Sequence, residues 1–473
     1  MLVLALESST TSAKALLYDS QKGVVRSESI PYAPGISQNG ISDTEAVYQS
    51  TMAVGRRVAQ GQDVAAVALG CVWHSVAICN GSLNAPDKTY SWNYTGSKTL
   101  CRQTRSNLEL TEKLYRSTGC MPHSSYVRET LRYLHANGMD LQNKLFPSQG
   151  SYQYYRMTGE FLETLNLLCG AGVMNVNRED FDPFALEYAC ARREQFGQKA
   201  FYTDVHPLKP EAAQMLGIAP GIPVVPAHGD GALNQLASCS AEVGCMSFSV
   251  GTSGAIRMTT KHPALSKGHH LWSYFGITDW ISGAATSGAC NCIDWFRKNY
   301  APEGMDYAKL DSGEETYANP PIFLPFLFGE RNPGWRDDRI GGFENLRDEC
   351  SLQEMYRSVQ TGILFNLYQC YEALVQEVGK PKKICLSGGI LNSKRWTQMA
   401  SDIFCAPMYC AKNMNASSIG AAILALHAAG AIGDVRAYEP DESDAQVILP
   451  RVERRDYYQS LFKQYLRYYA STL

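Results

Sequence analysis

The sequence lacks both an excess of one charge and any long apolar run. Its 473 residues carry 43 Lys and Arg against 46 Asp and Glu, which gives a net charge of −3. Without a basic surplus, nucleic acid is excluded as the main partner. No apolar stretch approaches the roughly 18 residues that a membrane-spanning helix needs. The opening run MLVLAL stops at Glu7, too short for the core of a secretion signal. We therefore expect a cytoplasmic protein that contacts no membrane.

Two common cysteine and phosphate motifs are also missing. The 15 cysteines include no CxxC pair of the kind that binds zinc, and the closest two are Cys290 and Cys292. Their spacing fits no disulfide framework, so we interpret them as reduced thiols, mostly in the core. A GxxxxGK[ST] loop is absent, which excludes a Walker-type nucleotide site. The partner is expected to be a small molecule.

Two similar segments indicate two homologous halves. Residues 2–18 read LVLALESSTTSAKALLY and residues 245–258 read CMSFSVGTSGAIRM. Each is an apolar strand, a turn rich in Ser, Thr and Gly, and a second strand. Thr10 and Thr252 occupy matching places, about half the chain apart. With 45% hydrophobic and 19% charged residues, the composition is that of a globular protein.

The rest of the chain alternates strand and helix. Residues 64–70, 221–227 and 382–389 read as buried strands. Residues 351–378 predict a long helix that begins at a capping box of Ser351 and Glu354 and ends before Gly379. Residues 416–430 predict a second helix whose small residues allow close packing. We expect α/β layers in two domains, 1–247 and 248–473.

Two turns could bind phosphate. In the first, Thr10, Thr11, Ser12 and Lys14 offer hydroxyls and a positive charge, and Glu7 could hold Mg²⁺ directly or through water. Taken alone, this segment is more simply a Ser/Thr-rich hairpin without a ligand. The second turn contributes Gly251, Thr252 and Ser253, whose glycine allows a ligand close to the backbone. Its similarity to the first turn strengthens both interpretations, because two such loops facing one another would form a nucleotide site between domains.

Further residues of the sequence are candidates for binding a nucleotide or a sugar. Gly388, Gly389 and Asn392 follow a strand and could support a purine or ribose, although this segment taken alone is more simply an ordinary glycine turn. Asp230 stands between glycines and could deprotonate a hydroxyl, although Asp is also common as a helix N-cap. Polar groups beside aromatic rings suit sugars. They are Trp73, His74, Trp92 and Asn93, with His74 in isolation more simply a core histidine.

In this order, the segments resemble the FGGY family of carbohydrate kinases, over about residues 2–470. The first and second turns look like its phosphate motifs, and VPAHGDGALNQLA (225–237) resembles the segment with the catalytic Asp. FLPFLFGERNPGW (323–335) is similar to its Gly-Glu-Arg-x-Pro signature, and the region from 384 to 426 resembles its adenosine site. The resemblance implies two ribonuclease H-like domains of the actin/Hsp70-like ATPase type, with an interdomain cleft.

Within the family, WHSVAICNG (73–81), GTSGAIR (251–257) and GERNPGW (329–335) are most similar to gluconokinases, and xylulokinases come next. The departures lie mostly on the sugar side. Glu7 replaces the Asp of the first strand. The Arg that usually follows the tryptophan is Gly96, which removes an obvious partner for a sugar-acid carboxylate.

The resemblance implies an ATP- and Mg²⁺-dependent phosphotransferase acting on a primary hydroxyl of an open-chain sugar or sugar acid, best matched by D-gluconate. Xylulose or another ketose or polyol is the alternative. Asp230 would be the base, near pKa 4 as for a surface Asp, and with Glu7 would hold Mg²⁺. His74, Trp73, Trp92, Asn93 and Tyr126 would bind the sugar.

Two other classes remain open: an actin/Hsp70-like ATPase without a sugar, and a non-catalytic sugar sensor. A homodimer is left open as the assembly state.

Overall fold

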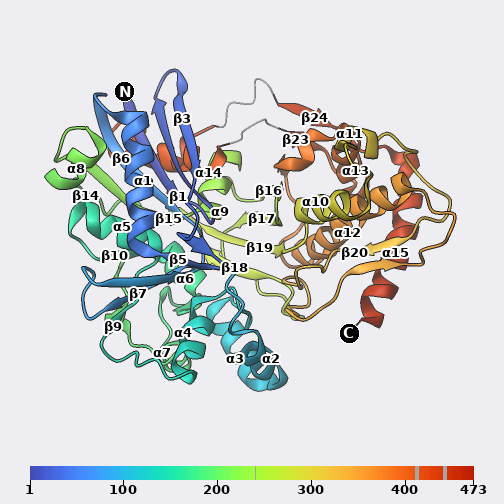
Figure 1. The fold of residues 1–473 in the computed structure, drawn as a ribbon, viewed down its shortest axis with the longest axis horizontal. Coiled ribbons are helices and arrows are strands. Elements are labelled where there is room, and N and C mark those ends of the chain that lie inside the picture. Colours follow the sequence, from blue (N-terminus) through green and yellow to red (C-terminus); the bar gives the residue numbers. More distant parts are fainter. Residues whose placement is uncertain (240, 411–414, 440–444, 473) are drawn as a thin grey trace.

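The computed structural model describes residues 1–239, 241–410, 415–439 and 445–472. Two large sheets lie side by side, each covered by helices (Figure 1). The mixed α/β fold in two domains is therefore confirmed. Within these residues, no helix combines the length and apolar character required to cross a bilayer.

The first large sheet has six strands in the order β14-β15-β6-β1-β2-β3. β1 pairs antiparallel with β2 and parallel with β6, and β15 is parallel to β6. The predicted strands at 64–70 and 221–227 are β6 and β15. The bounds are β1 Leu2–Ser8, β2 Ser12–Asp19, β3 Gly23–Pro31, β6 Val64–Cys71, β14 His206–Pro207 and β15 Pro223–Gly229.

The second large sheet has seven strands in the order β18-β19-β17-β16-β22-β23-β24. Here β16 pairs antiparallel with β17 and parallel with β22. The bounds are β16 Cys245–Val250, β17 Gly254–Thr260, β18 Trp272–Phe275, β19 Trp280–Thr286, β22 Lys383–Ser387, β23 Met408–Cys410 and β24 Gln446–Ile448.

The two sheets repeat one topology. In each, a hairpin of two antiparallel strands is followed by a third antiparallel strand on one side and two parallel strands on the other. Thr10 and Thr252 lie in the turns of the corresponding hairpins. The internal repeat expected from these two turns is thus present in the fold.

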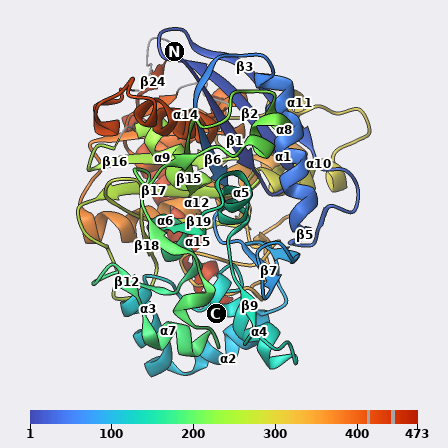
Figure 2. The ribbon, with the colours of Figure 1, turned by 90° about the vertical axis from the view of Figure 1, so that its left-hand side faces the viewer.

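Smaller elements complete the half of the chain that holds the first sheet. A five-stranded sheet, β4-β5-β8-β7-β9, lies beside it, and α2, α3, α4 and α7 gather at one end of the molecule in both views (Figures 1 and 2). The strand bounds are β4 Ser37–Gln38, β5 Ile41–Asp43, β7 Val76–Asn80, β8 Pro86–Tyr90, β9 Lys144–Leu145, β10 Leu162–Thr164, β11 Met174–Asn175, β12 Asp180–Phe181 and β13 Gln198–Ala200. The helix bounds are α1 Thr44–Ala59, α2 Lys98–Ser106, α3 Leu108–Thr118, α4 Val127–Ala136, α5 Gln149–Thr158, α6 Leu165–Ala171, α7 Pro183–Tyr188, α8 Pro210–Leu216 and α9 Asp230–Cys239.

Long helices cover the second sheet. The helix expected at 351–378 is α12, and the Ser351 hydroxyl accepts a hydrogen bond from the Glu354 amide at its start (3.1 Å). Large apolar side chains of α12 and α15 fill the core beneath the sheet. The bounds are α10 Cys290–Tyr300, α11 Tyr307–Leu310, β20 Ile322–Leu324, β21 Gly342–Glu344, α12 Leu352–Val378, α13 Lys394–Phe404, α14 Ala416–Ala428 and α15 Arg455–Ser471.

Helix α14 belongs by sequence to the second half but packs on the first sheet. It lies against β1, β6 and α9, and its buried side chains join the core of that sheet. Close packing is possible because Gly420 faces the backbone of α9, where a Cβ would overlap the Leu233 carbonyl oxygen. The small residues of this helix thus serve the contact that the sequence predicted. The domain boundary at 247/248 stays a prediction.

We predict that Gly420→Ala lowers the free energy of unfolding by about 1–3 kcal/mol, because the added methyl group forces α14 away from α9. Helix propensity alone would favour alanine over glycine by about 1 kcal/mol. A decrease in the free energy of unfolding can therefore come only from the clash. Urea denaturation measures the change.

Gly433→Ala is the matched control, since a Cβ there meets no atom within 4 Å. Equal stability of the two variants would contradict the packing argument.

Candidate functional site

The first turn is organised by the buried carboxylate of Glu7, near the end of β1. Glu7 Oε1 accepts hydrogen bonds from the Ser9 hydroxyl and the Lys14 ammonium, both at 2.9 Å. Oε2 accepts from the hydroxyls of Ser417 (2.7 Å) and Ser418 (2.9 Å) on α14. Burial raises the pKa of Glu7, but the positive charge of Lys14 and these hydrogen bonds outweigh it and leave the pKa lowered. Glu7 is therefore ionised.

This arrangement limits how Glu7 can meet a metal. A carboxylate offers about four lone-pair sites, and Glu7 uses all four on its neighbours. Direct ligation of Mg²⁺ does not fit this set, whereas contact through a water molecule does. Lys14, expected to bind phosphate, forms an ion pair with Glu7. Sequence reasoning missed Ser417 and Ser418, because a partner 410 residues away leaves no local signal.

The other residues of the first turn differ in exposure. Thr10 is half-buried, and its hydroxyl accepts a hydrogen bond from the Trp92 indole at 3.1 Å. This bond places an expected sugar residue against an expected phosphate residue. Thr11 is exposed. Ser12 lies on β2, where its hydroxyl accepts from Ser29 (3.4 Å).

The second turn is held by the start of α10. The amide of Cys290 donates to the Gly251 carbonyl (2.8 Å), and the amide of Asn291 donates to the Thr252 carbonyl (3.3 Å). Within the turn, the Gly251 amide donates to the Ser253 carbonyl at 3.0 Å. Thr252 itself is exposed, so its hydroxyl can reach a ligand.

The third segment lies directly beside the second turn, because β22 is parallel to β16. Gly388 has φ +96°, and a Cβ there would overlap the Val250 carbonyl oxygen, so glycine is required on both counts. Gly389–Asn392 form a single 3₁₀ turn whose last residue, Asn392, is exposed. The structure thus brings the second and third predicted segments together.

Asp230 is the first residue of α9, directly after β15. Its Oδ1 accepts hydrogen bonds from the amides of Gly231 (2.7 Å) and Trp73 (3.4 Å). Oδ2 has no hydrogen-bond partner in the part of the chain that the structure describes. Burial and the charge of Glu7 raise the pKa of Asp230, and Arg257 opposes them. The expectation of a surface Asp with a pKa near 4 is therefore wrong, because the side chain is desolvated where the two sheets meet.

Trp73 and His74 follow β6 and are both buried. The Trp73 indole donates to the Asn166 carbonyl (3.0 Å), and its ring lies 5.1 Å from that of Tyr274 on the second sheet. His74 Nδ1 lies 2.5 Å from the Gly170 carbonyl oxygen. Burial lowers the pKa of His74 to about 3, so the ring is neutral.

Tyr126 and Asn93 complete the expected sugar residues. The hydroxyl of Tyr126 shares a hydrogen bond of 2.6 Å with that of Tyr274, and Tyr126 is fully buried. Asn93 differs, since its side-chain oxygen is buried and finds no partner among the described residues. An unsatisfied buried acceptor of this kind is free to receive a hydrogen bond from a ligand.

Two arginines that the sequence analysis did not select also lie in this region. Arg257 is on β17, and a Cβ at Gly231 would lie 3.0 Å from its Nε. Arg331 lies over the ring of Trp92, with its guanidinium carbon 5.8 Å from the ring centre. Its charge lowers the pKa values of His74 and Arg257, which places it near both. Arg257 and Arg331 each lie in a motif identified in the sequence, but only the fold brings them close together.

Neither arginine forms an ion pair with a carboxylate within the described ranges, and the Nε of each is buried without an acceptor. Burial lowers the pKa of Arg257, while Asp230 raises it. Asp230 is the carboxylate whose charge acts on Arg257, whereas Glu7 is already paired with Lys14. The arrangement has unmatched positive charge and suits an anionic ligand.

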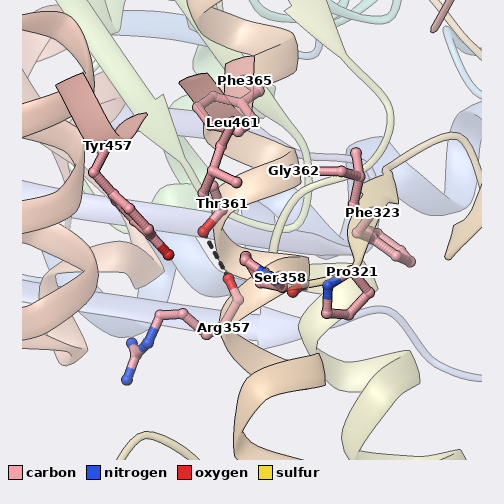
Figure 3. A pocket seen from close by; sticks show the side chains of 11 residues that line it. Pro321, Phe323, Arg357, Ser358, Thr361, Gly362, Phe365, Tyr457 and Leu461 are labelled. Atoms are coloured by element: carbon pink, nitrogen blue, oxygen red, sulfur yellow. Dashed lines mark hydrogen bonds between the residues drawn. The ribbon is translucent and has the colours of Figure 1, made fainter. Parts of the chain in front are cut away.

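A small pocket elsewhere contains none of these residues. It lies in the second half between β20, α12 and α15 (Figure 3). Its walls are mainly apolar, and the hydrogen bond drawn there is the Thr361 hydroxyl to the Arg357 carbonyl, within α12. We assign it no part in the site.

The comparisons with known proteins cover most of the chain. The model of the FGGY family of carbohydrate kinases, N-terminal domain, matches residues 2–237, and that of the C-terminal domain matches 246–429. A gluconokinase from Bacillus subtilis is 26% identical, over 91% of this chain and 88% of its own. A xylulose kinase from the same organism is 23% identical, over 99% and 97%. The crystal structure of gluconate kinase from Lactobacillus acidophilus superposes with a TM-score of 0.90 at 24% identity, covering 100% of this chain and 98% of that one.

We predict that Lys14→Met lowers the free energy of unfolding at pH 7 by about 1–3 kcal/mol, since Glu7 then keeps a buried charge without its cation. The lowered pKa of Glu7 means that its interactions stabilise the fold above its ordinary value of 4.5 and are lost as the pH falls through the lowered value. The difference in free energy of unfolding between wild type and variant should therefore become smaller at acidic pH. Urea denaturation at several pH values measures it.

Lys22→Met, at an exposed lysine in the next turn, is the control. If wild type and Lys14→Met differ in free energy of unfolding by the same amount at pH 7 and below pH 4, the role given to Glu7 is contradicted.

Proposed function

This chain belongs to the FGGY family of carbohydrate kinases, and from that premise we propose that it transfers the γ-phosphoryl group of ATP to the terminal hydroxyl of a sugar acid, with D-gluconate as the substrate. Members of the family are phosphotransferases with an alcohol acceptor. The proposal concerns the nucleotide, the sugar and the residues that bind them. The observation that carries the choice of a sugar acid is that Arg257 and Arg331 form no ion pair within the described residues, and that the buried Nε of each has no acceptor.

Asp230 is the proposed base. It lies where the first sheet meets the second, with one carboxylate oxygen held by backbone amides and the other free to face a substrate. As the sugar oxygen bonds to the γ-phosphorus, the bond to the bridging oxygen of ADP breaks and Asp230 takes the hydroxyl proton. Phosphoryl transfer needs mainly alignment and charge neutralisation, and a base held by two amides supplies the alignment.

The three loops are the proposed nucleotide site. Thr10 and Thr11 from the first turn and Gly251, Thr252 and Ser253 from the second would surround the phosphates. The segment of Gly388, Gly389 and Asn392, which lies beside the second turn, would hold adenosine. Mg²⁺ would be held through water by Glu7 and Asp230, which leaves the free oxygen of Asp230 for the sugar hydroxyl. It would supply charge neutralisation on the phosphates.

The proposed sugar site combines Trp73, His74, Trp92, Asn93 and Tyr126. Because neutral His74 donates from Nδ1 to the Gly170 carbonyl, its Nε2 can accept a hydrogen bond from a sugar hydroxyl without adding charge. The two arginines compensate for the arginine missing at Gly96. A guanidinium group donates two parallel hydrogen bonds to a carboxylate. A neutral ketose has no carboxylate to accept them. Similarity to the gluconokinase of Bacillus subtilis supports the same substrate.

We predict that Asp230→Asn lowers kcat by at least about 10²-fold while ATP binding is retained, because the variant keeps the shape but cannot accept the proton. Because the pKa of Asp230 is raised, wild-type kcat/KM should fall with decreasing pH at a higher pH than an ordinary Asp would give. Coupled ADP release gives the rates and calorimetry the ATP affinity.

Asp63→Asn, at an exposed Asp before β6, should leave turnover unchanged. Unchanged turnover in Asp230→Asn would remove Asp230 from the mechanism. Release of ADP without any sugar would favour an ATPase instead.

We predict that Arg331→Met raises the KM for gluconate by about 10- to 100-fold, through loss of a charged hydrogen bond in a desolvated place. The panel is gluconate, xylulose, ribulose, rhamnulose, fuculose, erythritol and glycerol, assayed by ADP release. Wild type should prefer gluconate, and the variant should lose that preference while its KM for ATP is unchanged.

Arg336→Met, in the same loop but paired with Asp338, controls for loss of a positive charge. If wild type phosphorylates xylulose or another neutral sugar better than gluconate, the sugar-acid proposal fails and the family assignment stands.

A further inference from the structure

Three cysteine thiols converge behind the proposed active site. Cys239 ends α9, Cys245 begins β16 and Cys385 is in β22. Their sulfur atoms all lie within 4.8 Å of one another. The side chains are 3%, 2% and 8% exposed, so the cluster is almost closed to solvent. The sequence does not indicate the cluster, because Cys385 follows Cys245 by 140 positions and the three residues form no CxxC pattern.

The strand register explains the convergence. Cys245 pairs with Lys383, and Ser247 pairs with Cys385, so all four side chains share one face of the second sheet. Helix α9 packs across this face and brings Cys239 from the side of the first sheet. Two parallel strands and one helix end thus aim three sulfurs at one point.

The surroundings of the thiols differ from an ordinary apolar core. The three cysteines pack with one another and with Tyr409, apart from the two large cores. The hydroxyl of Ser247, which is fully buried, has no hydrogen-bond partner among the described residues. The side-chain oxygen of Gln235, on α9 one turn before Cys239, is likewise buried and unsatisfied within the described chain. Buried polar atoms without a protein partner are rare in folded proteins, and they distinguish this place from an apolar core.

We propose that Cys239, Cys245 and Cys385 bind one thiophilic divalent ion, Zn²⁺. Thiolates are preferred zinc ligands, and three sulfurs that converge within 4.8 Å of one another would close onto one bound ion at Zn–S distances of about 2.3 Å. Binding releases the three thiol protons to solvent, so the site becomes three thiolates and Zn²⁺ with a net charge of −1. Water or another small donor takes the fourth position.

The charges around the cluster bear on a filled site. Hydrogen bonds from Cys239 and Cys245 lower the pKa of Cys385, whereas the pKa values of Cys239 and Cys245 are raised, with burial among the causes. The positive charge of Lys383 opposes the rise at Cys245 and adds to the lowering at Cys385. Lys383 therefore offsets part of the negative charge that a filled site would carry.

The position gives the ion a structural consequence. Helix α9 begins at Asp230, β16 leads to Gly251, and β22 leads to Gly388. An ion bound to all three elements ties the proposed base to the two loops of the second sheet. Occupancy would restrain movement between the sheets at this junction.

The test is metal binding by the full chain, reduced and freed of metal, in a background where the exposed Cys190 and Cys405 are alanine. We expect one equivalent of Zn²⁺ per chain by elemental analysis. Co²⁺ should give a thiolate charge-transfer band that saturates at one equivalent and is displaced by Zn²⁺. The melting temperature should rise by several degrees on binding.

The variants Cys239→Ala and Cys385→Ala should each lose the charge-transfer band and the rise in melting temperature. Cys370→Ala, at a buried thiol in α12 outside the cluster, should keep both. Circular dichroism before metal addition identifies any variant that does not fold, and Cys245→Ser then replaces it.

Three outcomes would overturn the proposal: no stoichiometric uptake, equal uptake in the cluster variants, or a disulfide between two of these cysteines in the purified protein. None of these measurements depends on kinase turnover, so the metal site and the proposed function can fail separately.

Discussion

The carboxylate of Glu7 joins the two ends of the chain. It lies at the end of the first strand, and half of its hydrogen bonds come from Ser417 and Ser418, 410 and 411 residues later. Lys14, on the neighbouring strand, neutralises its charge. A buried carboxylate without such partners would be strongly destabilising, so the first turn and α14 depend on each other. Through α14, the same contact fixes the position of α9 and of the carboxylate at its start.

Local features of the fold could be predicted from the sequence. The two hairpins, the helix that begins after Ser351 and the small-residue helix at α14 all follow from periodicity, capping and turn residues within short windows. The matching places of Thr10 and Thr252 even indicated the internal repeat. These predictions succeeded because each depends on neighbours in the chain.

Properties that depend on distant residues could not be predicted in the same way. Asp230 looked like a surface residue, yet packing between the sheets raises its pKa. Lys14 looked free to bind phosphate, yet it pairs with Glu7. Arg257 and Arg331 come from segments more than 70 positions apart and approach one another only in the folded chain. Burial and charge at a site are sums over the whole fold, and a motif reports only its own residues.

The charged residues at the junction of the two large sheets also explain why the proposed sugar site lies there. Arg257 and Asp230 both lose solvation where the sheets meet, and the opposing shifts of their pKa values show that they only partly compensate one another. A desolvated cation without a partner destabilises the folded state unless a ligand neutralises it. Helix α9 is only ten residues long. It connects this region to the cysteine cluster at its other end. The proposed base and the thiol of Cys239 therefore lie at the two ends of one helix, which is held in place by the close contact between Leu233 and Gly420 of α14.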